Sequence, residues 1–183
     1  MVPFPLTVEY ALLGFLREGP LHGYAIYRQI SDSDKIGLVW QLKRSQLYAL
    51  LARLEDEGHL TSVLEPQDAR PPRKVFELTE SGLHAFLDWV QSPVLHGREV
   101  RLTFLVKLYF AQREGPEVAA GLIEQQRKIC QGWLATHRGR SHAARSSQPY
   151  KWLVHQFRIG QIEAIMTWLN DCQQVATTGD SAT

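Results

Sequence analysis

Cysteine is scarce in this chain of 183 residues: it has two, Cys130 and Cys172, and they form no Cys-x-x-Cys pair. Small secreted domains that lack a large core usually carry many disulfides, so the chain does not belong to that class. We therefore expect both thiols to be reduced and packed inside the protein, as is usual in a reducing cytosol.

Long apolar runs are also missing. The apolar stretch Tyr10–Leu16 follows Glu9, has no basic segment before it, and is far shorter than the ~20 residues that a membrane helix needs. A hydrophobic content of 44% excludes a wholly disordered chain and is enough for one sizeable core, or for a small domain with an appendage. We expect a soluble, cytoplasmic protein with no membrane partner.

Charge of one sign is not in excess either. The formal net charge is +1, which by itself does not indicate a nucleic-acid binder. Between Lys43 and Glu77, six basic residues are balanced by six acidic ones. The basic residues lie mostly at the start of a predicted helix and on a predicted hairpin, whereas Glu55–Glu57 lie at the end of that helix. This distribution fits either a DNA contact or a solvated helix face.

Motifs for catalysis and for cofactors are absent from the sequence. Gly19–Tyr24 lacks the Gly-Lys-Ser ending of a phosphate-binding loop, and Pro20 removes an amide donor, so we interpret this segment as a turn between helices. Ser45 has no nucleophile elbow around it. Four further candidates match no standard zinc spacing: Cys130, His137, His142 and His155. We predict no enzyme, no cofactor and no metal site.

What the sequence does contain is the pattern of a winged helix-turn-helix in its first half. A predicted helix, Ser45–Glu57, ends at Gly58, and two alternating segments, Leu60–Leu64 and Lys74–Leu78, follow it as strands. The core face of that helix is a stripe of leucines at helical intervals: Leu47, Leu50, Leu51 and Leu54.

In such a fold the helix enters the DNA major groove, and the hairpin, here Glu65–Pro72, reaches the adjacent backbone or minor groove. The hairpin is expected to be Pro-rich and stiff, and Ser45 is expected to cap the helix N-terminus. Arg44 at that end can pair with guanine or hold a phosphate, and we favour the phosphate. The predicted DNA-binding residues are Lys43, Arg44, Ser45, Gln46, Tyr48, Ala49, Arg53, Arg70, Arg73 and Lys74.

Helices are predicted before and after this motif. Thr7–Arg17 and His22–Ser31 carry apolar residues at helical spacing on either side of a Gly-Pro stop, and Thr79 is a suitable N-cap for a further helix. The winged helix-turn-helix domain is therefore expected at residues 1–92.

The second part of the chain is expected to be entirely helical. After a linker at 93–100, a dimerisation or effector domain is predicted at 101–176, followed by a disordered tail at 177–183. Within this domain the polar stretch His137–Pro149 is interpreted as a mobile loop and Tyr150–Gln174 as the last helix. The fold class is thus mostly α, a winged helix-turn-helix followed by a helical domain.

The segment Arg127–Arg158 is the most basic part of the chain and contains no acidic residue. It fits a role in approaching DNA, in binding an anionic effector, or simply as a solvated loop. Its aromatic side chains can stack on an aromatic ligand, or belong to the core or to a dimer interface. The candidate effector-binding residues are Trp133, Tyr150, Trp152 and Phe157.

Short strings that occur in order along the first domain resemble the PadR family of bacterial transcriptional regulators. They are Ala11–Gly14, Gly19–Tyr24, Leu47-Tyr48, Leu54–Gly58 and Leu78–Gly82. The resemblance is strong through this domain. Val100–Leu169 is similar to the helical dimerisation domain of the family's longer-tailed branch.

That resemblance implies a homodimeric repressor in the bacterial cytoplasm, associated with the nucleoid when it binds double-stranded DNA. It implies a near-palindromic operator and release by a small, often aromatic, effector. A two-fold dimer matches two half-sites about 34 Å apart. We expect the dimer to be held by Tyr10–Leu16 and by an apolar face of the last helix, formed by Ile162, Ile165, Met166 and Leu169.

The sequence also departs from the family pattern. Lys43–Gln46 stands where the family has a small turn before its Leu-Tyr pair, and Phe76 stands where a tyrosine is common. The operator sequence therefore does not transfer from the family. The alternative function is a winged-helix module that contacts proteins and does not bind DNA.

Overall fold

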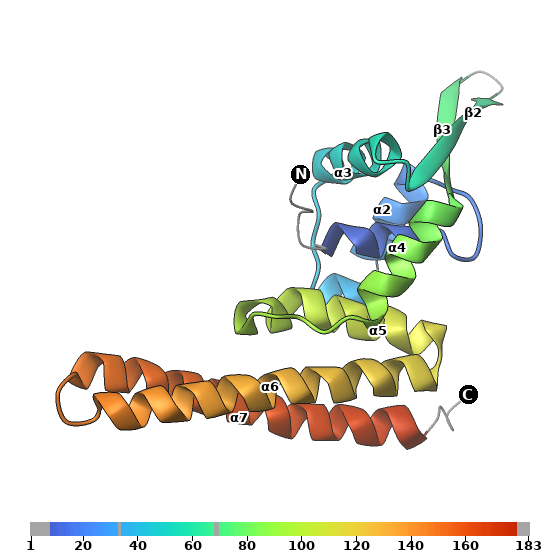
Figure 1. Cartoon of the computed structure of the whole chain (residues 1–183). Coiled ribbons are helices and arrows are strands. Elements are labelled where there is room, and N and C mark those ends of the chain that lie inside the picture. Colours follow the sequence, from blue (N-terminus) through green and yellow to red (C-terminus); the bar gives the residue numbers. More distant parts are fainter. Residues whose placement is uncertain (1–7, 33, 68–69, 179–183) are drawn as a thin grey trace. The chain divides into compact units, whose positions relative to one another are not determined.

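The computed structural model describes residues 8–32, 34–67 and 70–178 (Figure 1). These residues form two compact units that alternate along the chain. The first unit contains the described residues up to Gln91 together with Val100–Phe110. The second unit contains Ser92–Glu99 together with the described residues from Ala111 onward.

The first unit is a winged helix-turn-helix, as the sequence predicts. Its elements in chain order are η1 Val8–Tyr10, α1 Ala11–Phe15, β1 Leu21–His22, α2 Gly23–Ser31, η2 Ile36–Leu38, α3 Arg44–Asp56, β2 Leu60–Gln67, β3 Arg70–Leu78, α4 Glu80–Gln91, the π-helix η4 Val100–Phe104 and the first part of α5 Leu105–Glu114. The strands form an antiparallel sheet in the order β1-β3-β2.

Apolar side chains of the helices form the core of this unit. Of the four leucines predicted to face the core, Leu50 is half-buried and three are fully buried: Leu47, Leu51 and Leu54. Phe110 meets Phe15 edge-on with 5.1 Å between ring centroids, and it meets Phe86 in the same way at 5.7 Å. Burial of each such side chain stabilises the fold by ~1.5–3 kcal/mol, so the unit depends on a segment that follows α4 in the sequence.

The start of α3 differs from the prediction by one residue. The helix begins at Arg44, so Ser45 lies inside it and is not its N-cap. The N–H of Lys43 instead donates to the side-chain oxygen of Gln46 at 3.0 Å, as the third residue of a capping box does. The predicted cap at Ser45 is therefore wrong, because the helix starts one residue earlier and the side chain of Gln46 accepts the N–H at its start.

The end of α3 is fixed to the start of α4. Gly58 has a φ of 78°, which favours glycine, and the N–H of His59 donates to the carbonyl of Leu54 at 2.9 Å. Thr79 caps α4 as predicted, because its hydroxyl oxygen accepts from the N–H of Gly82 at 3.0 Å. The same hydroxyl donates to backbone carbonyls at the end of α3.

The β2–β3 hairpin is longer than predicted. Most of residues 65–72, which were expected to form a hairpin loop, belong to the two strands, and positions 68 and 69 lie outside the described residues. Pro71 and Pro72 are tolerated because β1 pairs with β3 at Val75 and Phe76, so that at the prolines β3 has β2 as its neighbour on one side.

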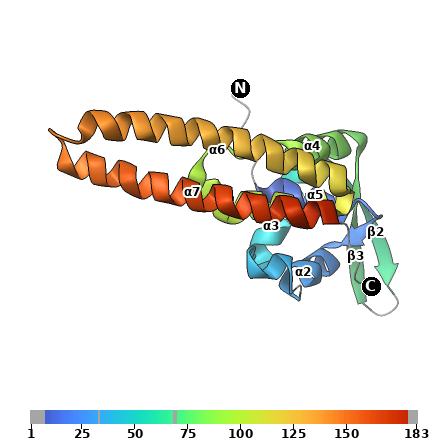
Figure 2. The same cartoon turned by 90° about the horizontal axis from the view of Figure 1, so that it is seen from below.

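The second unit is an antiparallel helical hairpin of α6 Pro116–Ala144 and α7 Pro149–Thr178, preceded by η3 Gly97–Glu99 (Figure 2). Gly115, with a φ of 133°, precedes α6, and Pro116 occupies the first turn. The last helix is confirmed and is longer than predicted. It includes Thr177 and Thr178, and the rest of the predicted tail lies outside the described residues.

The prediction of a mobile loop at His137–Pro149 is wrong. Residues up to Ala144 continue α6, and only 145–148 connect it to α7. Although the stretch is polar, its inward positions are small: Ser141 and Ala144 are buried. The side-chain amide of Gln156 on α7 donates to the hydroxyl of Ser141 at 2.9 Å. The hydrophobic period is therefore present, but it is carried by residues that do not count as hydrophobic.

A buried glutamine attaches the segment after α4 to α6. Gln126 is fully buried; its side-chain oxygen accepts from the N–H of Val94 at 2.8 Å, and its amide donates to the carbonyl of Val94 at 3.2 Å. One side chain thus makes the pair of bonds that a neighbouring strand would make. Val94, which lies within the predicted linker at residues 93–100, is therefore held in place.

Most of the apolar residues that suggested a dimer are already buried in one chain. Ala11–Leu16 is buried within the first unit, and Ile162 and Leu169 are buried in the second. These faces are core, because α1 packs on α4, and α6 packs on α7 along its length. Tyr10, Ile165 and Met166, which were also expected to hold a dimer, are half-buried. A dimer contact through these three residues stays a prediction.

The two cysteines form no disulfide: Cys130 is buried and Cys172 is half-buried. Burial, with a smaller contribution from Asp171, raises the pKa of the Cys172 thiol to about 11, and burial also raises the pKa of the Cys130 thiol. Both thiols are therefore poor nucleophiles. Among the described helices, none is long and apolar enough to cross a bilayer.

Candidate nucleic-acid interface

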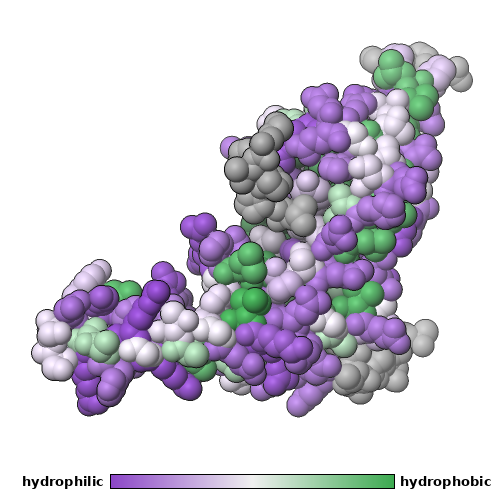
Figure 3. All heavy atoms as spheres, in the orientation of Figure 1, coloured by the Kyte–Doolittle hydropathy of each residue, from purple (hydrophilic) through white to green (hydrophobic). Residues whose placement is uncertain are grey.

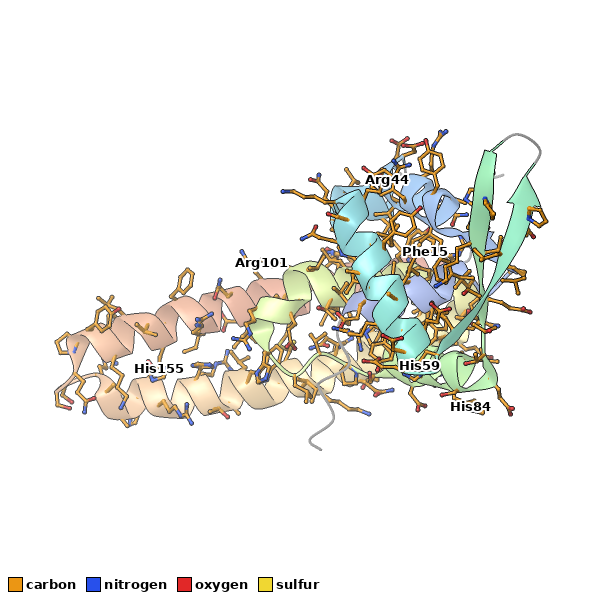
Figure 4. All side chains as sticks on the ribbon, turned by 90° about the horizontal axis from the view of Figure 1, so that it is seen from above. Phe15, Arg44, His59, His84, Arg101 and His155 are labelled. Carbon is orange, nitrogen blue, oxygen red and sulfur yellow. The ribbon has the colours of Figure 1, made fainter. Side chains whose placement is uncertain are left out.

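The outward side of α3 carries the predicted reading residues. Figure 4 shows Arg44 at the N-terminal end of this helix and His59 just beyond its C-terminal end. The exposed residues on and beside this side of the helix, opposite the buried leucines, are Lys43, Arg44, Ser45, Gln46, Tyr48, Ala49 and Arg53. The leucine period therefore predicted correctly which side of α3 is free.

Two of the predicted cations are already paired within the chain. The guanidinium of Arg53 forms ion pairs with Glu9 and, at 3.5 Å, with Glu57. Lys74 on β3 lies 2.5 Å from a carboxylate oxygen of Glu55. The hydrogen bonds from Lys74 and then from Ser62 hold the pKa of Glu55 below its usual value. These pairs attach α3 to its surroundings and leave less positive charge for a partner.

Three other cations carry the available charge. Within the described residues, Lys43, Arg44 and Arg73 make no ion pair, and all three are exposed. The first turn of α3 has no acidic residue, so the positive end of the helix dipole adds to Lys43 and Arg44. The side chain of Arg70 lies outside the described residues. An anion such as a phosphate is thus best bound at the start of α3 and beside Arg73.

The orientation of Tyr48 is set by α2. A Cβ on Gly23 would lie 2.7 Å from Cε1 of Tyr48, so the tyrosine ring lies directly on the glycine at the start of α2. The ring remains 42% exposed. Close packing on one side and exposure on the other give Tyr48 a fixed surface for contact, which its helical position alone did not predict.

The hairpin presents apolar side chains as well as charge. Val63 and Leu64 on β2 are 63% and 66% exposed, and Figure 3 shows hydrophobic residues on this part of the unit. Strict alternation would bury one of the two. Both are exposed because the hairpin extends beyond the core that its base covers.

The predicted effector residues do not form one cluster. Trp133 lies four residues before His137 on α6, and Tyr150 lies five residues before His155 on α7. His137 and His155 face each other across the hairpin, so Trp133 and Tyr150 are separated by about 13 Å along the helices. Tyr150 and Phe157 are strongly exposed, and Trp133 and Trp152 are half-buried. An effector site at these residues stays a prediction.

A pair of histidines joins α6 to α7. The Nδ1 atoms of His137 and His155 are 3.0 Å apart, and His155 is buried between the two helices (Figure 4). Two neutral rings can share one hydrogen, whereas two protonated rings cannot. In the part of the chain that the structure describes, no three His, Cys, Asp or Glu side chains come together to hold a metal ion.

This pair predicts a loss of stability in acid. Burial, and then the charges of His155, Arg140 and Arg158, lower the pKa of His137 below its usual 6.5. The unfolded chain therefore binds more protons, so the stabilisation is complete above pH ~6.5 and decreases as the pH falls toward the lowered pKa. We expect the Tm to fall by a few degrees more between pH 8 and pH 5 in the unmodified protein than in His137→Gln. His142→Gln, at an exposed position of the same helix, should retain the full pH dependence; an equal slope in all three proteins would contradict the prediction.

Comparison with known proteins places these observations in a family. Residues 12–87 match the model of the transcriptional regulator PadR-like family, and residues 100–176 match a second model, virulence activator alpha C-term. The negative transcriptional regulator PadR of Bacillus subtilis is 32% identical over 133 residues, which cover 73% of this chain and 72% of that protein.

Two crystal structures of the same Bacillus subtilis protein are also similar. Its complex with operator DNA has a TM-score of 0.47 and 27% identity, covering 91% of this chain and 98% of that one. Its complex with p-coumaric acid has a TM-score of 0.41 and 26% identity, covering 93% and 98%.

Proposed function

The chain belongs to the PadR-like family of transcriptional regulators, and from this membership we propose that it is a repressor that binds a near-palindromic operator as a homodimer. It is a regulator and not an enzyme. In this proposal α3 lies in the major groove and the β2–β3 hairpin lies along the adjacent backbone. Repression is in keeping with its Bacillus subtilis relative, which is a negative regulator.

The observation that carries the proposal is the arrangement of cations on the first unit. Lys43 and Arg44 at the start of α3, and Arg73 on the hairpin, are exposed and free of ion pairs within the described residues. They lie on the two elements that contact DNA in a winged helix-turn-helix. Phosphate contacts from such groups position the helix, and Gln46, Tyr48 and Ala49 are then available to contact base edges.

A gel-shift titration with DNA fragments that span the protein's own promoter tests the proposal. We expect preference for one near-palindromic fragment over random DNA and an affinity that falls as salt is raised. Equal affinity for all fragments at every salt concentration would contradict it and would favour the alternative, a winged-helix module for protein contact. If the protein does not bind DNA but pulls down an acidic protein partner, that alternative is supported.

Removing the charge of Arg73 should weaken binding to all sequences. We expect Arg73→Ala to lower affinity severalfold and to reduce the slope of log K against log salt by about 0.9, the value for one phosphate contact. Arg101→Ala removes another exposed arginine, which lies on η4 outside the proposed interface, and should leave both quantities unchanged. Identical salt slopes for the two variants would remove Arg73 from the interface.

The dimer contact is proposed to be an exposed apolar face of α7, which we call the α7 face: Tyr150, Leu153, Val154 and Phe157. These residues recur at helical intervals and are between 38% and 81% exposed. A contiguous apolar face of this kind usually marks an interaction site, and a second copy of the chain covers it by two-fold symmetry.

Release from DNA by a small aromatic effector completes the proposal, as the family resemblance implies. Isothermal titration with p-coumaric acid, the ligand of the Bacillus subtilis protein in its crystal structure, is the first test. Substitution of Trp133 or Trp152 by alanine then tests whether the predicted residues take part, since neither belongs to the α7 face. Binding that is unchanged in both variants would place the site elsewhere.

A further inference from the structure

Arg44 differs from the other cations of the interface in what it touches. Its guanidinium carbon lies 4.9 Å from the ring centroid of Tyr24 on α2, within the ~6 Å range of a cation–π contact. Arg53 and Lys74, by contrast, lie against carboxylates. Arg44 is therefore held by a neutral ring that leaves its full charge in place.

Tyr24 is itself fixed in position. It follows His22 and Gly23 at the start of α2, where Nδ1 of His22 accepts from the N–H of Ala25 at 3.0 Å. The Tyr24 ring lies 6.4 Å from the His22 ring and 6.5 Å from the Tyr27 ring, with interplanar angles of 15° and 23°. The platform beneath Arg44 is thus a row of nearly parallel rings anchored by a helix cap.

A second guanidinium also interacts with Tyr24. Arg28, one turn later on α2, is held by Asp32, and the pKa of its guanidinium is raised mainly by that carboxylate and to a smaller extent by Tyr24. Tyr24 therefore interacts with two guanidinium groups. Arg28 is neutralised by Asp32, whereas Arg44 makes no ion pair within the described residues.

We propose that Tyr24 is a positioning residue that holds the Arg44 guanidinium at the start of α3 in the orientation in which it contacts DNA. The face of the guanidinium is covered by the ring, while the N–H groups at its edge remain free for a phosphate or a guanine. Less side-chain entropy is then lost on binding. The inference depends on the proposed DNA-binding function and adds to it a specific residue of α2.

The test is a double-mutant cycle on the full chain, with affinity for the operator fragment measured by fluorescence anisotropy. Tyr24→Phe keeps the ring and should bind like the unmodified protein. Tyr24→Leu should bind about two- to fivefold more weakly, the range of an exposed cation–π contact. In the Arg44→Ala background, Tyr24→Leu should cause no further loss.

Lys43 provides the matched control because it precedes Arg44 and makes no ring contact in the described part of the chain. The losses from Tyr24→Leu and Lys43→Ala should therefore multiply. If the losses of affinity from Tyr24→Leu and Arg44→Ala also multiply, the inference is overturned. It is likewise overturned if Arg44→Ala binds the operator normally, or if Tyr24→Phe binds as weakly as Tyr24→Leu. That last result would indicate a direct contact by the hydroxyl.

A measurement without DNA separates this inference from the function on which it depends. In NMR spectra of the unmodified protein and of Tyr24→Phe, the Hε resonance of Arg44 should be shifted by the ring current of residue 24. Relaxation measurements should show that the Arg44 side chain moves slowly. Both signatures should be lost in Tyr24→Leu. Failure of the unmodified chain to bind any DNA contradicts the proposed function. An Arg44 Hε resonance that is the same in the unmodified protein and in Tyr24→Leu contradicts the inference alone.

Discussion

Replacing Gly82 by alanine is expected to lower the free energy of unfolding by about 3 kcal/mol or more, a large effect for one methyl group. A Cβ at this position would overlap the backbone carbonyl oxygen of His59 and lie 2.9 Å from Leu78 Cδ1. That carbonyl also accepts from the N–H and the hydroxyl of Thr79, so it cannot move without breaking the junction between α3 and α4. Operator affinity should fall with stability, because this junction sets the direction of α3 and of the hairpin.

Chemical denaturation followed by circular dichroism measures this effect. Gly121→Ala is the matched control, since Gly121 lies in the second turn of α6 with nothing within 4 Å of an added Cβ. It should leave the protein unchanged or up to ~1 kcal/mol more stable, as alanine is the better helix former. Equal denaturation midpoints for the two variants would show that the α3–α4 junction adjusts freely.

Two aspartates on the α7 face, Leu153→Asp with Phe157→Asp, are expected to convert the proposed dimer to a monomer and to lower operator affinity about a hundredfold or more. The large factor arises because a monomer contacts one half-site, and specific binding exceeds non-specific binding by ~4–10 kcal/mol in total. Folding should survive, since the two side chains are 57% and 63% exposed. Light scattering gives the mass, and anisotropy gives the affinity.

A control variant with the same added charge distinguishes two causes of weaker operator binding, which are charge repulsion by the DNA and loss of the dimer. Gly139→Asp with Asn170→Asp also introduces two carboxylates into the hairpin, at exposed positions outside the α7 face. This variant should remain dimeric and bind the operator nearly as the unmodified protein does. A Leu153–Phe157 variant that stays dimeric at micromolar concentration would contradict the proposed contact.

Periodicity predicted the architecture of the first unit because its helices bury large side chains. The leucines of α3 identified the helix, its inner side and its outer side. The same reasoning failed at His137–Pro149, where Ser141 and Ala144 occupy the inward positions and give no hydrophobic signal. It failed differently on α7, which carries apolar residues on two sides. Ile162 and Leu169 face the core, Leu153 and Phe157 do not, and only the packing of α6 distinguishes the two sets.

The sequence predicted which residues form the candidate interface, but it did not predict which of their charges are already paired within the chain. Sequence placed Arg44, Arg53 and Lys74 on the right elements. It gave no sign that Arg53 meets Glu9 from η1, or that Lys74 meets Glu55 from α3. Tyr24 was missed for the same reason, because contacts between residues so far apart in sequence depend on how α2 and α3 pack.

The alternation of the two units along the chain sets the order in which they can form during synthesis. When the last residue of α4 has left the ribosome, the first unit still lacks Phe104 and Phe110, which are buried in its core. The segment Ser92–Glu99 emerges next, well before Gln126, the residue that holds Val94. The surface proposed to read DNA is therefore completed only after translation has passed the beginning of the second unit. A prematurely terminated chain that ends after α4 carries the α3 sequence without the core that supports it, and we expect it to be degraded and not to compete for the operator.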